Sequence, residues 1–519
     1  MKKVLFFFPN SANWAAISTV IPSLAGIARH KGWKAEYFDT YKHETGMDSS
    51  TEKEKAGGFK KGFMFFADGK IPKERIVPDL QERIDSFHPD LIVINAMSYE
   101  YQFLLTFFHK VKIPKDTTVI IGGIHSTLSP MEVAESGLFD LVAIGQGELT
   151  FKELLDKIEN GEKLTEIRGT YFYDRQSKTV KTNPRRRLAS AEELWDVKQD
   201  FSFFDDAYFV RPFDGKMIRR YDMEVARGCP FSCSYCGNTA LKKIYTQGGE
   251  EPEPLTKFLI KRPLDSCMEH MKMMVDDHKI DIFQFTDECF LSHPFSWLRD
   301  FMKRYAAEIG KPFIFQTRAE TVSDEKLREI VQYNIPFQVS IGVESGSEKI
   351  LQVCNRECKA EQVITAFDLL HKYDIRCNAF CMMGLPYETR EDYFMTVDLC
   401  RRIKPSVCSV SIFQPQPGQE LTKLCIEKGF LSPDKPMVTF TQESLLEMPP
   451  PYLSAEEIKN LWRVFMLYVA LPEEYYPQIK RCEVDYEANQ ELFERLMALR
   501  WEKFDFAKLR NEKIMLPEC

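Results

Sequence analysis

Three cysteines at short spacing are the residues of this chain with the most specific chemistry. Cys229, Cys233 and Cys236 follow the pattern C-x3-C-x2-C. Three thiolates so close together can bind three irons of a [4Fe–4S] cube and leave the fourth iron open to another ligand. A zinc site or a fully ligated cluster needs a fourth side chain, and no Cys or His follows at a matching spacing within 30 residues. We therefore expect a cluster with an open iron, with a zinc site and three unrelated core cysteines as the alternatives.

The triplet stands directly after a predicted strand that opens a series of alternating strands and helices. The strand candidates are Met223–Ala226, Ile280–Phe285, Phe313–Gln316, Phe337–Val343, Ile375–Met383 and Val407–Phe413. This alternation predicts a partial (β/α)6 barrel of the TIM type over residues 219–430, followed by a helical cap over residues 431–519. In such a barrel the chemistry lies at the C-terminal ends of the strands, where the triplet stands.

The first 160 residues predict a separate α/β unit. Its apolar runs of strand length are Val4–Phe8, Lys34–Phe38, Asp90–Asn95, Thr117–Ile121 and Leu138–Ile144. Near-continuous apolar strands between helices are typical of a parallel sheet buried on both faces, so residues 1–160 are expected to form a doubly wound, Rossmann-like domain. Residues 161–218 are charged and irregular, and we expect a linker there with a small hairpin around Gly169–Lys181.

The segment Arg227–Asn238 resembles the signature of the radical S-adenosylmethionine (radical SAM) superfamily. The resemblance implies that Cys229, Cys233 and Cys236 hold the cluster and that SAM binds its open iron. One electron then cleaves SAM to a 5′-deoxyadenosyl radical, which takes hydrogen from the substrate. The implied partners are a small-molecule substrate and an external electron donor such as a flavodoxin or ferredoxin.

Further segments that match the superfamily's pattern follow the later strands in order. Arg318 ends the third strand, where it could pair with the SAM carboxylate. Gly342–Ser347 ends the fourth strand and Met383–Glu388 the fifth. From this resemblance we expect SAM contacts from Tyr235, Gly237, Asp287, Glu288, Arg318, Glu344, Ser345, Gly384 and Leu385.

A doubly wound domain before such a barrel resembles the cobalamin-binding half of the B12-dependent radical SAM class. The matching segments are Pro22–Ala25, Gly122–Thr127 and Gly145–Glu148. Their glycines would let a corrin ring or its nucleotide tail lie against the backbone. The expected cobalamin contacts are Asn10, Ser11, Trp14, Ser98, Gly122, Gly123, His125, Gly145, Gln146, Gly147 and Glu148.

One motif departs from the classical cobalamin pattern D-x-H-x-x-G. His43–Gly46 keeps H-x-x-G, but Tyr41 stands at the Asp position. Without that carboxylate a cobalt–histidine bond is poorly supported, so we expect His43 to be a surface histidine. The lower face of the cobalt is then left to water or to the loop Asn10–Trp14. Methylthiotransferases carry three cysteines in a similar N-terminal domain, and that branch is disfavoured because no cysteine precedes Cys229.

Two other cysteine pairs raise the question of a second cluster. They are Cys354 with Cys358 and Cys377 with Cys381. We expect both pairs to serve in packing. Cys377 and Cys381 share one face of a strand, which we assign to the barrel interior, with Cys381 nearer to the site.

Composition restricts the partners and the location. The 69 Lys and Arg against 77 Asp and Glu give a net charge of −8, which disfavours a nucleic-acid partner. No apolar run approaches the roughly 20 residues of a membrane span, and the N-terminus lacks the h-region and cleavage site of a signal peptide. With 14 cysteines, these features predict a reducing compartment, the cytoplasm.

The sequence hypothesis is therefore a cobalamin-dependent radical SAM enzyme. We expect a methyltransferase that moves a methyl group from methylcobalamin to an unactivated carbon or phosphorus after radical activation of the substrate. Three alternatives stay open: a cobalamin-dependent rearrangement, ring contraction or cyclisation without methyl transfer; a radical SAM protein whose N-terminal domain is only a scaffold; and a non-catalytic corrin or iron–sulfur sensor.

Overall fold

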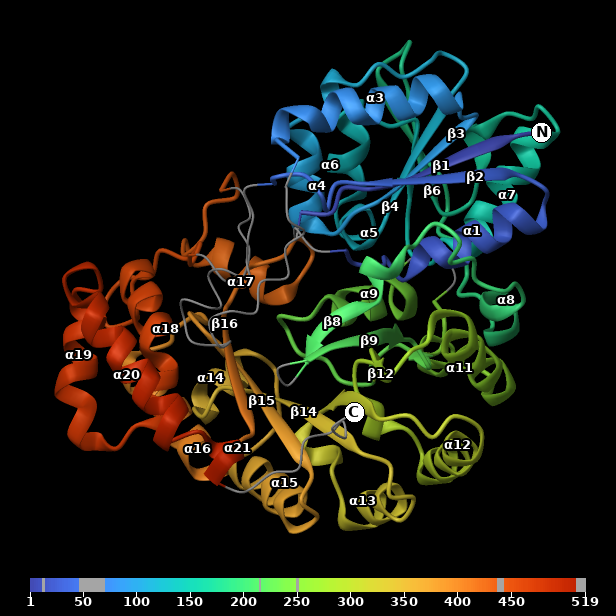
Figure 1. Cartoon of the computed structure of the whole chain (residues 1–519). Coiled ribbons are helices and arrows are strands. Elements are labelled where there is room, and N and C mark those ends of the chain that lie inside the picture. The colour runs from blue at the N-terminus through green and yellow to red at the C-terminus, as the bar shows by residue number, and fades with distance from the viewer. Residues whose placement is uncertain (12–14, 46–70, 214–215, 249–251, 436–442, 510–519) are drawn as a thin grey trace.

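The computed structural model describes residues 1–11, 15–45, 71–213, 216–248, 252–435 and 443–509. An N-terminal lobe with its own sheet lies above a curved second sheet, and a group of C-terminal helices flanks that second sheet (Figure 1). The fold class expected from the sequence, α/β with a doubly wound domain and a partial barrel, is confirmed.

The first sheet has the strand order β2-β1-β3-β4-β5-β6-β7, and β1 to β5 are parallel. Its strands are β1 (Lys3–Phe8), β2 (Lys34–Asp39), β3 (Leu91–Asn95), β4 (Thr118–Gly122), β5 (Leu141–Ala143), β6 (Thr170–Asp174) and β7 (Thr179–Thr182). The helices around it are α1 (Val20–His30), α3 (Ile76–Phe87), α4 (Ser98–Leu105), α5 (Ile124–Leu128), α6 (Pro130–Glu135) and α7 (Glu148–Glu159).

Both faces of this sheet are buried at its centre, because β1, β3 and β4 contain continuous apolar runs. In β1, Phe6 packs with residues of α1 and α7, whereas Phe7 packs with residues of α3, α4 and α6. Successive side chains of a strand point to opposite faces, so a continuous apolar run needs helices on both sides.

The segment expected as a linker contributes strands to both sheets. β6 and β7 form the predicted hairpin and extend the first sheet in antiparallel pairing from β5. At the other end of the segment, β8 (Val210–Phe213) pairs antiparallel with the first strand of the barrel. The chain between residues 161 and 218 is therefore structured at both ends.

The second sheet has the order β16-β15-β14-β13-β12-β9-β8, with six parallel strands from β9 to β16. These are β9 (Lys216–Met223), β12 (Ile282–Phe285), β13 (Phe313–Thr317), β14 (Phe337–Glu344), β15 (Arg376–Met383) and β16 (Val407–Ile412). The outer helices are α11 (Leu264–His278), α12 (Phe295–Glu308), α13 (Asp324–Val331), α15 (Ala360–Lys372) and α16 (Arg390–Ile403). The sheet curves but does not close, since β8 and β16 do not pair with each other.

The first barrel strand lies earlier than the sequence predicted. β9 ends at Met223, where the expected strand Met223–Ala226 begins. Ile218, Tyr221 and Met223 are buried, but charged residues stand between them. Strand β9 therefore lacks the continuous apolar run that marks the other barrel strands.

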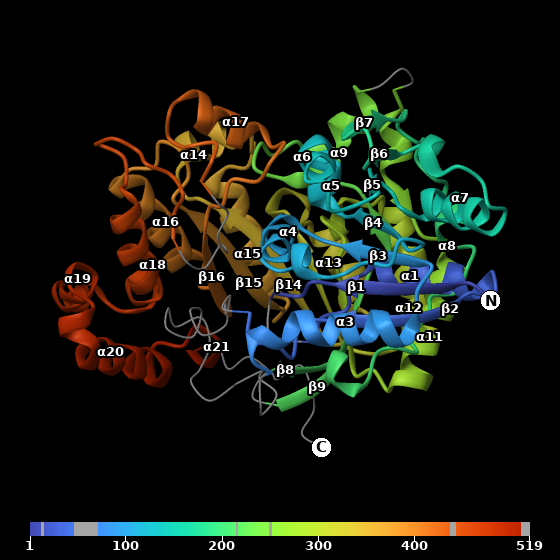
Figure 2. The ribbon, with the colours of Figure 1, turned by 90° about the horizontal axis from the view of Figure 1, so that it is seen from above.

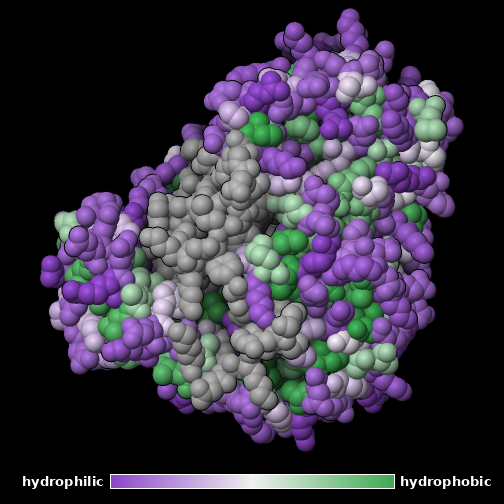
Figure 3. Space-filling model, viewed as in Figure 1, coloured by the Kyte–Doolittle hydropathy of each residue, from purple (hydrophilic) through white to green (hydrophobic). Residues whose placement is uncertain are grey.

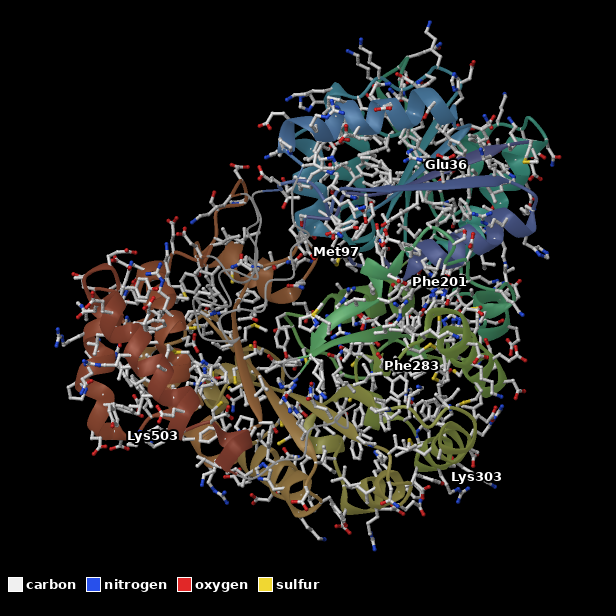
Figure 4. All side chains as sticks on the ribbon, in the orientation of Figure 1. Glu36, Met97, Phe201, Phe283, Lys303 and Lys503 are labelled. Atoms are coloured by element: carbon white, nitrogen blue, oxygen red, sulfur yellow. The ribbon has the colours of Figure 1, made fainter. Side chains whose placement is uncertain are left out.

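The two faces of the barrel sheet differ in polarity. Outer positions are apolar and buried, such as Phe283, which packs on Tyr305 of α12 and is labelled in Figure 4. Inner positions carry polar side chains, and register places Gln316, Ser340 and Asn378 side by side. Closed TIM barrels fill this space with branched apolar residues, so the inner face here is suited to a ligand that forms hydrogen bonds.

At the open edge of the barrel, α18 (Ala455–Ala470) packs against α16 and β16, and α19 (Tyr476–Val484) and α20 (Gln490–Lys503) pack against α18 (Figures 1 and 2). On the face shown in Figure 3, hydrophilic residues cover most of the described outer surface. Within the described ranges, no helix combines the length and apolar character needed to cross a bilayer.

Candidate active site

The cysteine triplet lies in a loop between β10 (Ala226–Arg227) and α9 (Gly237–Thr246). We call this segment, Gly228–Cys236, the cluster loop. The loop begins at Gly228, which has a φ of +90°. A Cβ added at this position would lie 2.3 Å from the carbonyl oxygen of Phe258, so only glycine fits. The loop ends at Cys236, which is the N-cap residue of α9.

Lys242 of α9 holds the middle of this loop. Its amino group donates to the carbonyl oxygens of Pro230 (3.1 Å) and Phe231 (2.6 Å) and to the hydroxyl of Ser232 (2.8 Å). Lys242 was not among the residues expected from the sequence, although it lies on the helix that follows the triplet. The loop is thus tied to its own following helix.

The three thiols do not converge on one point. Cys233 is buried, and Cys229 and Cys236 are half-buried. Among the described residues, these sulfurs do not form a group within 4.8 Å of one another, as ligands of one shared ion would. This spacing favours three irons of a cube over zinc. Burial raises the pKa of Cys229 to about 12 and that of Cys236 above its ordinary value.

Two buried arginines face Cys233. Arg318 lies with Nη1 3.0 Å from the sulfur, and its guanidinium stacks on Phe231 at 3.9 Å. Arg356 lies with Nη1 3.9 Å from the same sulfur and 3.3 Å from the hydroxyl of Tyr235. Arg318 was expected to bind the SAM carboxylate. Arg356 was missed, because it stands in a loop after α14 (Glu348–Val353) that carries no recognisable motif.

The residues that end β14 point in two directions. Glu344 has a φ of +63° next to a bulge and places Oε1 3.9 Å from Nη1 of Arg356. A non-glycine residue in this conformation is strained, as residues at functional sites often are. Ser345 is turned away from the triplet, since its hydroxyl contacts Thr396 at 3.3 Å and accepts the N–H of Ser347 at 3.1 Å. Of the two expected SAM contacts, only Glu344 faces the cluster loop.

A buried carboxyl shapes the turn after β15. Glu388 accepts the backbone N–H of Gly384 at 2.5 Å and that of Leu385 at 3.3 Å. Burial raises the pKa of Glu388 to about 8. Gly384 has a φ of +70°, and the side chain of Leu385 is fully buried. The backbone N–H groups of both expected SAM residues are therefore occupied by Glu388, which fixes the shape of the turn.

The two acidic residues after β12 have different environments. Asp287 is buried, accepts the N–H of Val225 at 3.3 Å and lies 3.5 Å from His293. Glu288 accepts the amide N–H of Asn238 at 3.0 Å, and burial raises its pKa to about 7. Asp287 supports the strand before the cysteines, whereas Glu288 lines a cavity.

This cavity of about 320 Å³ lies between the N-terminal domain and the barrel. Its first wall contains six of the expected cobalamin contacts: Gly122, Gly123, Gly145, Gln146, Gly147 and Glu148. Apolar residues of α1, β4 and α7, among them Leu24, Ile120 and Phe151, continue that wall. The opposite wall comes from the cluster loop and its surroundings, including Arg227, Gly228, Asn238, Tyr245 and Glu288.

Two contacts tie the start of the cluster loop and the following helix α9 to the loop Gly145–Glu148. Arg227, two residues before Cys229, forms an ion pair with buried Glu148 at 2.7 Å. Tyr245 of α9 accepts the backbone N–H of Gln146 at 2.9 Å. A Cβ added at Gly145 would lie 1.8 Å from the hydroxyl oxygen of Tyr245. We call these two contacts the interdomain latch.

Four of the remaining expected cobalamin residues do not line the cavity. Asn10, Ser11 and Ser98 are buried outside it. His125 is also buried, and its ring stacks on that of Tyr101 with centroids 4.3 Å apart. Trp14 lies outside the described residues.

The prediction for His43 is wrong. His43 is 3% exposed, and its Nε2 lies 3.0 Å from Oδ2 of Asp79. The Asp79 carboxylate of α3 therefore contacts the His43 ring, although the local motif has no Asp at its usual position. Sequence spacing could not reveal this partner, because Asp79 stands 36 residues away.

The assignment of Cys377 and Cys381 to the barrel interior is also wrong. The two residues share a face, but it is the outer one. Cys377 lies 3.5 Å from His371 of α15, and Cys381 lies 3.5 Å from Cys400 of α16. Cys354 and Cys358 are buried as well.

Comparison with known proteins agrees with this geometry. Residues 223–400 match the family model of the radical SAM superfamily. An uncharacterized methyltransferase of Pyrococcus horikoshii is 24% identical over 359 residues, which cover 68% of this chain and 73% of the relative. The anaerobic magnesium-protoporphyrin IX monomethyl ester cyclase of Rubrivivax gelatinosus is 23% identical over 374 residues, which cover 71% of this chain and 63% of the cyclase.

A solved structure extends the likeness to the whole fold. The radical S-adenosylmethionine methyltransferase TsrM from Kitasatospora setae, solved with cobalamin and a [4Fe–4S] cluster, superposes with a TM-score of 0.65. The sequences are 14% identical, and the match covers 97% of this chain and 99% of the other. The likeness therefore includes the N-terminal domain as well as the barrel.

Proposed function

From the premise that residues 223–400 form a radical SAM domain, we propose that the protein is a cobalamin-dependent methyltransferase. It would transfer a methyl group to an unactivated carbon or phosphorus of a small molecule. The observation that carries the proposal is the latch. It joins the cysteine loop of the barrel to the glycine-rich loop of a doubly wound domain across a shared cavity.

The cysteine loop fits an iron–sulfur cluster with an open iron. Cys229, Cys233 and Cys236 would bind three irons, which leaves the fourth iron of the cube open to SAM. Arg318 and Arg356 place positive charge beside Cys233, where it would stabilise an anionic cluster and the carboxylate of a bound SAM. Lys242 fixes the loop backbone.

The cavity fits a ligand with both polar and apolar parts. A Cβ at Gly147 would meet nothing within 4 Å, so this glycine borders open space. Oε2 of Glu148 is buried without a hydrogen-bond partner, which marks a polar atom available to a ligand. The apolar wall of Leu24, Ile120 and Phe151 would receive an aromatic group such as the nucleotide base of cobalamin.

When bound, the three cofactors supply the electron, the hydrogen-abstracting radical and the transferable methyl group. The protein orients them and excludes water. Tyr245 and Arg227 fix the distance between the two domains. Arg356 contacts both Glu344 and Tyr235 and so holds these two side chains in place.

The substrate would lie against the inner face of the barrel sheet. Oε1 of Gln338 and Oδ1 of Asn378 are buried there without hydrogen-bond partners. These acceptors call for N–H or O–H groups on the substrate. Phe380 on the same face is 39% exposed and offers an aromatic surface to the rest of the molecule.

Anaerobic reconstitution with iron, sulfide and cobalamin tests the proposal. The product should contain about four irons per chain, retain a corrin absorbance band and release 5′-deoxyadenosine from SAM when reduced. Cys233→Ala should lose the iron and the cleavage of SAM but keep the corrin. A protein that assembles the cluster and does not retain cobalamin would overturn the cobalamin half of the proposal.

We further propose that the enzyme works in the cytoplasm with an external one-electron donor such as a flavodoxin or ferredoxin. The described cysteines are all free thiols, as a reducing compartment requires. Reduction of the reconstituted cluster by each donor, followed by absorbance, tests this point.

A second candidate is a cyclisation or rearrangement without methyl transfer, and the likeness to the cyclase of Rubrivivax gelatinosus favours it. The two reactions differ in their products from SAM. Methyl transfer yields S-adenosylhomocysteine together with 5′-deoxyadenosine, whereas the alternative yields 5′-deoxyadenosine alone.

A further inference from the structure

Three buried thiols converge on the outer face of the barrel sheet. Cys381 is on β15, Cys400 on α16 and Cys408 on β16, and each is at most 3% exposed. The sulfur of Cys400 lies 3.5 Å from that of Cys381 and 3.7 Å from that of Cys408. We call this group the outer thiol trio. It lies on the opposite face of the sheet from the inner polar residues and includes none of the cluster cysteines.

The trio has the dimensions of a mononuclear sulfur site. All three sulfurs lie within 4.8 Å of one another. With sides of 3.5 Å and 3.7 Å and a third side of at most 4.8 Å, a point equidistant from the sulfurs lies at most about 2.4 Å from each. A zinc–sulfur bond is about 2.3 Å, so one ion fits at the centre without movement of the backbone.

A buried cation accompanies these thiols. Arg500 of α20 is 7% exposed and interacts electrostatically with Cys408. Thiolate is the form that binds metal, and a nearby guanidinium offsets part of the negative charge that sulfur ligands bring into the core.

We propose that the outer thiol trio binds one soft, thiophilic metal ion through three sulfur ligands. Thiolates select Cu(I) and zinc among common cellular metals. Within the described part of the chain, no fourth Cys, His, Asp or Glu joins the trio, and a three-coordinate site suits Cu(I) better than zinc, which takes four ligands. The ion would join β15, α16 and β16. This inference does not depend on the proposed function.

The test uses the full chain with Cys229, Cys233 and Cys236 replaced by alanine, so that the iron–sulfur ligands cannot contribute. This protein is expressed with added copper or zinc, so that the ion can enter during folding, and is purified without oxygen. Elemental analysis should find about one copper per chain. X-ray absorption should find sulfur ligands alone. Cys400→Ala in this background should lose the ion, whereas Cys267→Ala, which removes another fully buried cysteine, should keep it.

Thermal unfolding checks that the variants fold and supplies a second measurement. The copper-loaded parent and the Cys267→Ala protein should unfold at higher temperature than their metal-free forms, and the Cys400→Ala protein should show no such shift. Cys408→Ala serves as a second variant with the same expected loss. Absence of copper from the folded parent, or equal copper in the Cys400→Ala protein, would overturn the proposal. Preferential retention of zinc would contradict the proposed coordination of the ion by three sulfur ligands alone.

Discussion

Gly145→Ala is the sharpest test of the latch. The new Cβ would lie 1.8 Å from the hydroxyl oxygen and 2.8 Å from Cζ of Tyr245, so the tyrosine ring must move. Gln146 N–H then loses its acceptor, a loss of about 0.5–1.5 kcal/mol. Alanine at a φ of +77° costs a further 1–2 kcal/mol, roughly. The strain lowers the stability of the fold with or without ligand, so only the lost hydrogen bond should weaken cobalamin binding, by about two- to tenfold.

Equilibrium dialysis against cobalamin, followed by corrin absorbance, measures this effect. Gly161→Ala is the matched control, because Gly161 has a φ of +66° and nothing within 4 Å of an added Cβ. It carries the same backbone strain without the clash and should bind cobalamin as the parent does. Unchanged affinity in the Gly145→Ala protein, or an equal loss in both variants, would refute the role given to Tyr245.

Three further predictions concern the barrel. Arg356→Met removes the guanidinium beside Cys233 and Tyr235 and should weaken SAM binding, measured by calorimetry, about ten- to a hundred-fold. Arg356→Lys should restore only part of the SAM affinity. Unchanged affinity in the Arg356→Met protein would show that Arg356 is not part of the SAM site. Burial raises the pKa of Glu388 to about 8, so its contribution to stability is complete below about pH 4.5 and is lost as the pH rises to 8. The urea midpoint of the Glu388→Gln protein should therefore fall less over this pH range than the midpoint of the parent. Parallel curves for the two proteins would contradict the assignment. Asn378→Leu removes an amide from the inner face of the barrel sheet and should raise the KM for substrate about tenfold. Cleavage of SAM in the absence of substrate should be unchanged. An unchanged KM would show that the substrate binds elsewhere.

The fold was predictable where a local pattern identifies each element. Apolar runs marked the strands that helices cover, and five of the six barrel strands lie within a few residues of their predicted positions. Strand β9 was misplaced because charged residues stand between its buried residues. The hairpin of β6 and β7 was expected, but its pairing with β5 was not, since register with a distant strand leaves no trace in a local pattern.

The candidate site was predictable to the same extent. The cysteine spacing identified the cluster loop, and the glycine-rich segments identified one wall of the cavity. Three residues were not predicted because each contacts a partner that only folding brings close: Lys242, Arg356 and Tyr245. The face assigned to Cys381 was wrong for a related reason. Strand periodicity shows which residues share a face, but not whether that face meets helices or the barrel interior.

The interdomain latch also constrains how this chain can change over time. Any residue larger than glycine at position 145 collides with Tyr245, so the two positions are expected to vary together among homologues. The same holds for Glu148 and Arg227, whose charges must be exchanged or lost as a pair. An isolated barrel fragment would expose the side of its iron–sulfur loop that the other half now covers.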